Sequence, residues 1–98
     1  PPASKIIKFL ITGSQLKDVI EESQRLKNNL LNNKLTTLGP IPAPIEKIKS
    51  LWRYIIIIKS KDRKLIHSKI IQSINVDTLE KFNNKVKIQI DVDPVSLL

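Results

Sequence analysis

Apolar and polar residues alternate along three stretches of the chain, and this period of two is typical of half-buried β-strands. The stretches are residues 5–12, residues 51–61, which are the most apolar, and residues 85–93, which end at Pro94. Each stretch predicts a strand with one face toward a core. The side chains expected on the core face are Ile7, Phe9, Ile11, Trp52, Tyr54, Ile56, Ile58, Val86, Ile88, Ile90 and Val92.

Two other stretches carry apolar residues every three or four positions, which predicts amphipathic helices. The first runs from Gln15 to about Asn33, and Ser14 is expected to cap its start. The second follows Asp62, which is a suitable cap. Its apolar positions are Leu65, Ile66, Ile70 and Ile74.

Residues 35–45 contain three prolines at alternate positions, Pro40, Pro42 and Pro44. The three missing N–H donors fall on one side of an extended chain, so the segment cannot be a central strand. We expect an edge strand or a polyproline-like rim. A structural edge that prevents unwanted strand pairing is favoured over a docking site for an aromatic groove.

The elements follow the order strand, helix, strand, strand, helix, strand. This order predicts the α+β class and a ferredoxin-like split βαββαβ arrangement, with an antiparallel four-stranded sheet and two helices on one face. The other face is expected to be open, with basic residues around an apolar centre, which suggests contact with another domain or with nucleic acid. Its predicted members are Ile6, Lys8, Leu10, Arg53, Ile55, Ile57, Lys59, Lys87 and Gln89.

The chain has 98 residues, which is the size of one domain, and its first residue is Pro, so we expect a piece of a longer protein. Lys and Arg number 17 against 9 Asp and Glu, a net charge of +8. Such an excess attracts polyanions, nucleic acid first and anionic membrane second. The residues predicted to contact DNA phosphates are Lys8, Arg53, Lys59, Lys61, Arg63 and Lys87.

No combination of residues indicates catalysis or a bound metal or cofactor. There is neither a phosphate-binding GxxxxGK loop nor a nucleophile elbow. The size and element order are shared with acylphosphatases, but the loop at Gly13 lacks the Arg of their phosphate cradle. His67 is the only His, and the pair Asp91 and Asp93 lacks the further oxygen ligands that a hard cation needs.

The chain contains no Cys, which excludes disulfides and zinc-thiolate sites and fits a reducing cytoplasm. No stretch has the length of a membrane span, so neither a membrane location nor a membrane partner is expected. Trp52 begins the second alternating stretch, and the sequence leaves open whether it packs in the core or stacks on bases.

Several of these segments resemble the PriA family, the primosomal protein N′ helicases. The resemblance starts with Pro1-Pro2 and continues through Gly39-Pro-Ile-Pro-Ala-Pro-Ile45, Lys49, Trp52-Arg53-Tyr54, the strand ending at Lys59-Ser60, and Asp91-Val92-Asp93-Pro94. It covers essentially the whole chain. It departs from the family where Leu51 replaces a basic residue and Trp52 replaces Tyr.

The resemblance implies that residues 1–98 are a single C-terminal domain of a larger ATP-dependent DNA helicase, with ATP, magnesium and zinc bound elsewhere in that protein. It implies as partners single-stranded and forked DNA, single-stranded DNA-binding protein, other primosome proteins and the remaining domains of the helicase. Arg63 matches a family position that docks the acidic tail of single-stranded DNA-binding protein. His67 stands one turn later, where the family often has Gln.

Two hypotheses follow from the sequence. The first is a non-enzymatic, DNA-binding accessory domain that holds the DNA backbone and packs on the helicase core. The second is a protein-docking or structural platform without direct DNA contact. A continuous stripe of Arg53, Lys59 and Lys87 would favour the first, and a broad apolar patch around Ile55 and Ile57 would favour the second.

Overall fold

The computed structural model describes residues 5–32, 35–60 and 85–92. The elements are β1 (Lys5–Gly13), α1 (Leu16–Asn32), β2 (Thr37–Ile48), β3 (Leu51–Ser60) and β4 (Val86–Val92). The predicted α+β class and the predicted strands are confirmed, and so is the first helix. The second helix, predicted after Asp62, lies outside the described residues.

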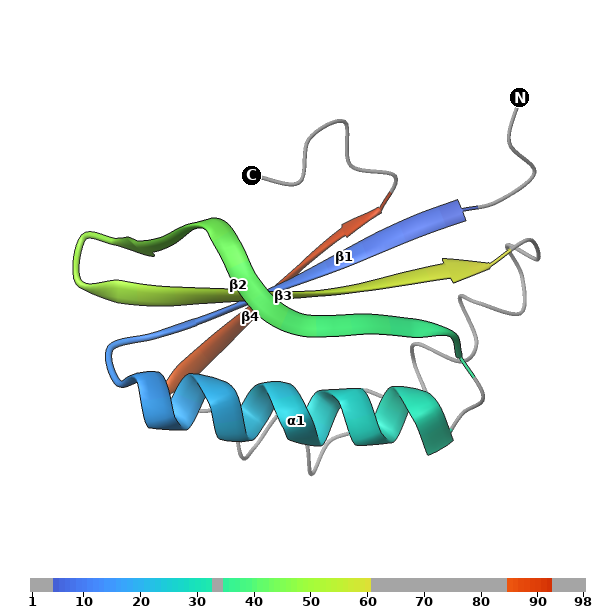
Figure 1. The fold of residues 1–98 in the computed structure, drawn as a ribbon, viewed down its shortest axis with the longest axis horizontal. Coiled ribbons are helices and arrows are strands. Elements are labelled where there is room, and N and C mark those ends of the chain that lie inside the picture. Colours follow the sequence, from blue (N-terminus) through green and yellow to red (C-terminus); the bar gives the residue numbers. More distant parts are fainter. Residues whose placement is uncertain (1–4, 33–34, 61–84, 93–98) are drawn as a thin grey trace.

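The strands form one antiparallel sheet in the order β2-β3-β1-β4 (Figure 1). β1 is central, with β3 on one side and β4 on the other. The proline-containing strand β2 lies at one edge, as the missing N–H donors require, so the predicted edge strand is confirmed. β4 forms the other edge of the sheet.

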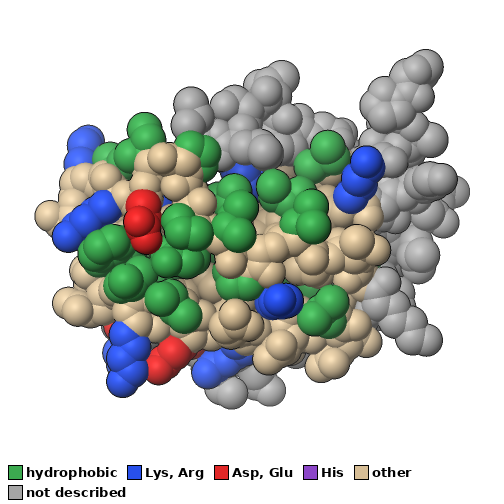
Figure 2. Space-filling view, viewed as in Figure 1, with side chains coloured by type: hydrophobic (Ala, Val, Ile, Leu, Met, Phe, Trp, Pro, Cys, Tyr) green, Lys and Arg blue, Asp and Glu red, His purple; other side chains and the backbone are tan. Residues whose placement is uncertain are grey.

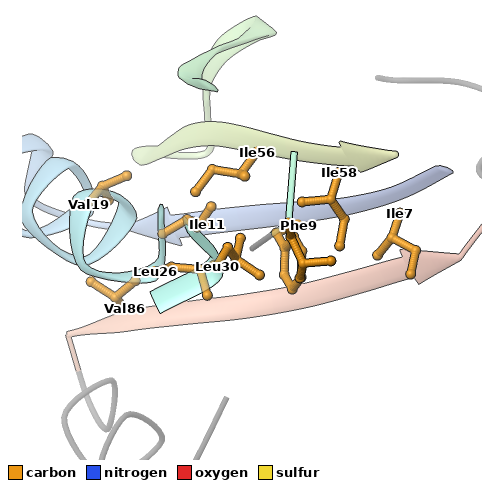
Figure 3. Close-up of a cluster of buried hydrophobic side chains, with 10 residues drawn as sticks. Ile7, Phe9, Ile11, Val19, Leu26, Leu30, Ile56, Ile58 and Val86 are labelled. Carbon is orange, nitrogen blue, oxygen red and sulfur yellow. The ribbon is translucent and has the colours of Figure 1, made fainter. Parts of the chain in front are cut away.

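α1 lies against one face of the sheet and contacts all four strands (Figure 1). Its buried side chains recur at helical spacing and meet the alternate side chains of the strands (Figure 3). Each large apolar side chain buried in this way contributes about 1.5–3 kcal/mol of transfer free energy. The core residues are Ile7, Phe9, Ile11, Val19, Leu26, Leu30, Leu35, Ile56, Ile58 and Val86.

Trp52, Tyr54 and Ile88 are half-buried and pack against this core. The alternation in β3 therefore places both aromatic residues on the α1 side of the sheet, as predicted. This placement assigns Trp52 to core packing. Ile90, in contrast, was expected to face the core, yet it is exposed on the edge strand β4.

The ends of α1 are fixed by two backbone hydrogen bonds. The Val19 N–H donates to the Gln15 carbonyl at 3.2 Å, so Gln15 takes the N-cap position that the sequence assigned to Ser14. At the other end, the Leu35 N–H donates to the Leu30 carbonyl at 3.1 Å. This bond holds the segment that leads into β2 against the end of the helix.

β2 is irregular at two places. Gly39 has a φ of 101°, and a Cβ atom there would lie 2.6 Å from the Ile55 carbonyl oxygen, so only glycine fits without a shift. Further on, residues 43–46 form a bulge opposite the single residue Arg53, because Pro42 pairs with Tyr54 and Lys47 pairs with Trp52. Such bulges bend an edge strand and disturb its hydrogen-bonding row.

The β2–β3 hairpin closes with a two-residue turn. Ile48 pairs with Leu51, and the intervening Lys49 and Ser50 have φ values of 51° and 65°. Two positive φ values identify a type I′ turn, whose twist matches that of the strands it joins. Neither residue is Gly or Asn, so the turn holds two side chains in a backbone region that disfavours them.

Candidate nucleic-acid interface

The sheet face opposite α1 carries four of the residues predicted to contact DNA, and the strand register arranges them in rows. They are Lys8, Arg53, Lys59 and Lys87. We call this sheet face the opposite face. The row nearest the β2–β3 turn places Thr12 between Arg53 and Lys87. Cross-strand partners point to the same side of a sheet, so the two cations flank Thr12 on one surface.

A shallow hollow of about 340 Å³ opens at this row. Lys49 reaches it from the turn, Arg53 from β3 and Lys87 from β4, and none of the described residues that line it is a carboxylate. We call it the basic hollow. Its lining residues are Leu10, Thr12, Ile48, Lys49, Leu51, Arg53, Lys87 and Gln89. Three cations around an apolar floor suit an anionic ligand that also has apolar surface.

A second hollow of about 330 Å³ adjoins the first and shares Thr12, Leu51 and Lys87 with it. It adds Lys85, which is exposed and directly precedes β4. The positive charge at this end of the sheet therefore continues from Lys49 across Lys87 to Lys85. Neither Lys49 nor Lys85 was predicted from the sequence to contact DNA, because only the turn and the strand register bring them to the hollows.

Arg53 also has a structural contact. Its Nη1 donates a hydrogen bond of 2.7 Å to the Ile45 carbonyl, within the bulge of β2. A hydrogen bond from a charged donor is stronger than a neutral one, so it fixes the bulge. Arg53 is half-buried, in contrast to the exposed Lys49 and Lys87.

The two neighbours of Arg53 contact the last bulge residue and the residue that follows the bulge, on the other side of the sheet. The Nζ of Lys47 lies 4.6 Å from the centre of the Trp52 ring, which is a cation–π contact. The Tyr54 hydroxyl donates to Glu46 Oε2 at 3.3 Å. Trp52-Arg53-Tyr54 thus acts as a structural unit in which each residue contacts one residue of the facing strand. We call this unit the hairpin clamp.

The pKa of Tyr54 is raised above its usual value of 10.0. Burial is the largest cause, and the negative charge of Glu46 and its hydrogen bond to the phenol add to it. All three disfavour the phenolate. The native state therefore keeps the Tyr54 proton more tightly than an unfolded chain does.

Lys8 does not join the basic hollow. Its side chain is only 5% exposed, and its Nζ lies 3.7 Å from Asp91 Oδ2, in the row two residues before Leu10 on β1. A buried ammonium group is costly to remove from water unless a carboxylate faces it, and Asp91 supplies that carboxylate. The predicted contact of Lys8 with a DNA phosphate stays a prediction, and the buried position of its side chain does not favour it.

Lys59 is exposed but pairs with Ile6 near the far end of β1. Lys59 lies six positions after Arg53 on β3, which is about 20 Å of extended chain. The rows between contain the Lys8–Asp91 pair and the buried Ile55, so Arg53, Lys59 and Lys87 form no continuous stripe among the described residues. Ile55 is 2% exposed and contributes no open apolar patch either.

Three of the residues that the sequence analysis selected, Lys61, Arg63 and His67, lie outside the described residues. Within residues 5–32, 35–60 and 85–92, no group of three His, Cys, Asp or Glu side chains is arranged to hold a metal ion. Across the same part of the chain, no helix is long and apolar enough to cross a bilayer.

The described architecture is a known class of α+β fold. The designed protein Foldit4 superposes with a TM-score of 0.63 at 9% identity, over 95% of this chain and 99% of that protein. A conserved protein of unknown function from Bacteroides thetaiotaomicron superposes with a TM-score of 0.55 at 5% identity, over 93% of this chain and 97% of that one. At such low identity the likeness concerns the fold alone.

The chain belongs to the family of primosomal protein N C-terminal domains, whose family model matches residues 1–95. It is similar to the replication restart protein PriA of Chlamydia pneumoniae, with 32% identity over 105 residues. That match includes 98% of this chain but only 13% of the relative, so the chain spans a small part of the relative's length. The family resemblance inferred from the sequence is confirmed.

Proposed function

We propose that this chain is the DNA-binding accessory domain of a replication-restart helicase, and that it contacts the backbone of single-stranded or forked DNA without sequence specificity. The family membership supports this role, since the relative from Chlamydia pneumoniae is named a replication restart protein. The net charge of +8 supports a polyanionic partner. Catalysis, nucleotide binding and zinc binding then belong to other domains of the helicase.

The observation that carries the proposal is the basic hollow. Lys49, Arg53 and Lys87 come from three different elements and converge on one shallow site, whose lining contains no carboxylate from the part of the chain that the structure describes. The two exposed ammonium groups, of Lys49 and Lys87, would bind phosphate oxygens. The apolar floor of the hollow would contact the face of a sugar or a base. Contacts of this kind position a protein on DNA but read no sequence.

The test is fluorescence anisotropy of labelled single-stranded, duplex and forked DNA across a salt series. Each phosphate contact contributes about 0.7 to the slope of log K against log salt for single strands. The double variant Lys49→Ala with Lys87→Ala should therefore lower the slope by about 1.4. Lys27→Ala with Lys59→Ala removes the same charge away from the hollow and should leave the slope nearly unchanged. Equal weakening by both variants, or no binding at low salt, would count against the site.

The second candidate function is protein docking, and a separate observation favours it. Large apolar side chains on the β2–β3 hairpin are 39–60% exposed, and Figure 2 shows hydrophobic side chains gathered over this hairpin. They are Leu38, Ile41, Ile45, Ile48 and Leu51. Exposed apolar patches of this kind are typical of surfaces that meet protein. The remaining helicase domains and other primosome proteins are the expected partners.

Docking through the hairpin can be separated from DNA binding. Leu38→Lys with Ile41→Lys places charge on the apolar surface and should prevent association with the remaining helicase domains supplied as a separate chain. DNA affinity should persist, since the change adds cations and spares the basic hollow. The acidic tail of single-stranded DNA-binding protein provides a further ligand, to be titrated against Arg63→Ala and His67→Ala.

We also infer that the segment between β3 and β4 supplies the second helix of a ferredoxin-like arrangement. β3 and β4 are both antiparallel to β1, so they run parallel to each other. Parallel strands in one sheet need a crossover connection, which is usually a helix. The helical spacing of Leu65, Ile66 and Ile70 supports this inference, and backbone chemical shifts in solution would test it.

A further inference from the structure

The second hollow, which adjoins the basic hollow, has the side chains of a phosphate subsite. Thr12 and Ser14 bring hydroxyl groups to it, and Lys85 and Lys87 bring ammonium groups. Hydroxyl and ammonium groups are donors that bind phosphate oxygens where proteins contact DNA. Among the described residues that line this hollow, none is a carboxylate. The second hollow therefore suits a phosphate group of its own, next to those in the basic hollow.

The backbone of Lys85 is held against the end of β1. Gly13, the last residue of β1, pairs with Val86, the residue after Lys85. A Cβ atom at Gly13 would lie only 2.7 Å from the Lys85 carbonyl oxygen, so the two backbones are in close contact. A backbone fixed in this way has less freedom to lose when its side chain binds a ligand. Lys85 thus offers an exposed ammonium group from a preorganised position.

The spacing of Lys85 and Lys87 matches the repeat of a nucleic-acid backbone. The two residues are two positions apart and line the same hollow. Two positions of extended chain correspond to about 6.4–6.8 Å between Cα atoms. This is close to the separation of successive phosphates along a single strand. Lys87 also lines the basic hollow together with Lys49, so the positive charge passes from one hollow to the other without a gap.

Leu51 lies between the two hollows, since it lines both of them. It is 43% exposed. An exposed aliphatic side chain between two phosphate sites packs favourably against the face of an unpaired base, because the contact removes apolar surface from water. In a duplex the base faces are stacked on neighbouring bases and do not reach such a side chain. Leu51 therefore favours a single strand over a duplex.

We propose that the second hollow is a phosphate subsite, and that a single DNA strand crosses from the basic hollow into it. Lys49 and Lys87 bind phosphate in the basic hollow, and Lys85 binds the next phosphate in the second hollow. One unpaired base packs on Leu51. The inference rests on the proposed function and adds two features to it: the DNA runs across the strands at one end of the sheet, and unpaired DNA is preferred to paired DNA.

The salt dependence of single-strand affinity tests the second subsite. Lys85→Ala removes one phosphate contact and should lower the slope of log K against log salt by about 0.7. Lys59→Ala removes the same charge from an exposed position at the far end of the sheet and should leave the slope nearly unchanged. The subsite is refuted if Lys85→Ala matches Lys59→Ala while Lys49→Ala with Lys87→Ala still lowers the slope, and the basic hollow then stands. If the unmodified chain binds no DNA, the proposed function fails and this inference fails with it.

Fluorescence anisotropy with single-stranded and duplex DNA of equal phosphate number tests the base contact. Leu51→Ala should weaken binding of the single strand about fivefold and leave duplex binding unchanged. Ile45→Ala is the matched control, because Ile45 lies on the same hairpin, is 49% exposed and lines neither hollow. An equal effect of Leu51→Ala on the two DNAs, or an equal effect of the two variants on the single strand, would overturn the placement of a base on Leu51.

Discussion

Arg53→Ala gives the sharpest test of the hairpin clamp, because two accounts of Arg53 predict different results. The substitution removes the hydrogen bond of 2.7 Å from Nη1 to the Ile45 carbonyl. Hydrogen bonds to charged groups contribute about 1.5–3 kcal/mol when buried, but this bond is exposed, so about 1 kcal/mol is expected. For a domain of this size, that loss lowers Tm by about 4–8 °C.

The assay is thermal unfolding followed by circular dichroism, with Lys87→Ala as the matched control. Lys87 is the other cation of the same row, and it is exposed, so its removal should change stability by less than about 0.5 kcal/mol. Intrinsic fluorescence of Trp52 reports the hairpin itself, since the chain contains a single Trp. It should change with Arg53→Ala and not with Lys87→Ala.

One combination of results would refute the reasoning on Arg53. If Arg53→Ala leaves Tm and the Trp52 fluorescence unchanged but abolishes DNA binding, then Arg53 contacts DNA directly. In that case the hairpin clamp does not stabilise the fold. If instead Tm falls and DNA affinity falls only modestly, Arg53 supports the basic hollow indirectly, because it fixes the bulge of β2. DNA binding by Arg53 variants therefore has to be interpreted together with their stability.

Three further results are expected from the hairpin. Lys49→Asn with Ser50→Gly places residues that accept a positive φ in the turn. The free energy of unfolding, measured by urea denaturation, should rise by about 1 kcal/mol. No gain in stability would contradict the turn type. Gly39→Ala meets a backbone oxygen of β3 at a φ of 101° and should cost about 3 kcal/mol, so an unchanged urea midpoint would rule out the close approach. Tyr54 is the only Tyr, and absorbance titration should show its pKa above 10.0, with Glu46→Gln lowering the pKa only in part because burial is the larger cause.

The raised pKa of Tyr54 also has a consequence for stability. Since the native state holds the phenol proton more tightly than the unfolded chain, this contribution is fully present below pH 10.0 and is lost as the pH rises through the raised pKa. Tyr54→Phe removes the titrating group, so its unfolding free energy should depend less on pH in the alkaline range. An equal alkaline loss in both chains would assign that loss to other groups.

The fold was predictable from local patterns to a large extent. Alternation placed three strands, and the spacing of Val19, Leu26 and Leu30 placed α1, because a period of two or of 3.6 depends only on backbone geometry. The missing N–H donors of three prolines placed β2 at an edge of the sheet for an equally local reason. The N-cap of α1 is Gln15 and not the predicted Ser14. Helix ends commonly shift by one or two residues in this way.

The candidate site was less predictable, because its members meet only through the register. Arg53 and Lys87 lie far apart in the sequence, yet both flank Thr12. Lys8 and Lys59 show the opposite result: alternation assigned each to the opposite face, but one is buried beside Asp91 and the other lies at the far end of the sheet. An apolar pattern with a period of two predicts which face of the sheet a side chain lies on. It predicts neither the row of that side chain nor its burial.

By itself, the sequence determined the four strands and the first helix, the edge position of the proline strand, the excess of positive charge and the family. All of these depend on neighbouring residues or on composition. Only the tertiary structure decided that Trp52-Arg53-Tyr54 clamps the bulge of β2, that Lys49 and Lys87 share a hollow, and that a second hollow with Lys85 adjoins it. These features arise when strands distant in sequence align side by side, and the alignment is fixed by the packing of the whole sheet against α1.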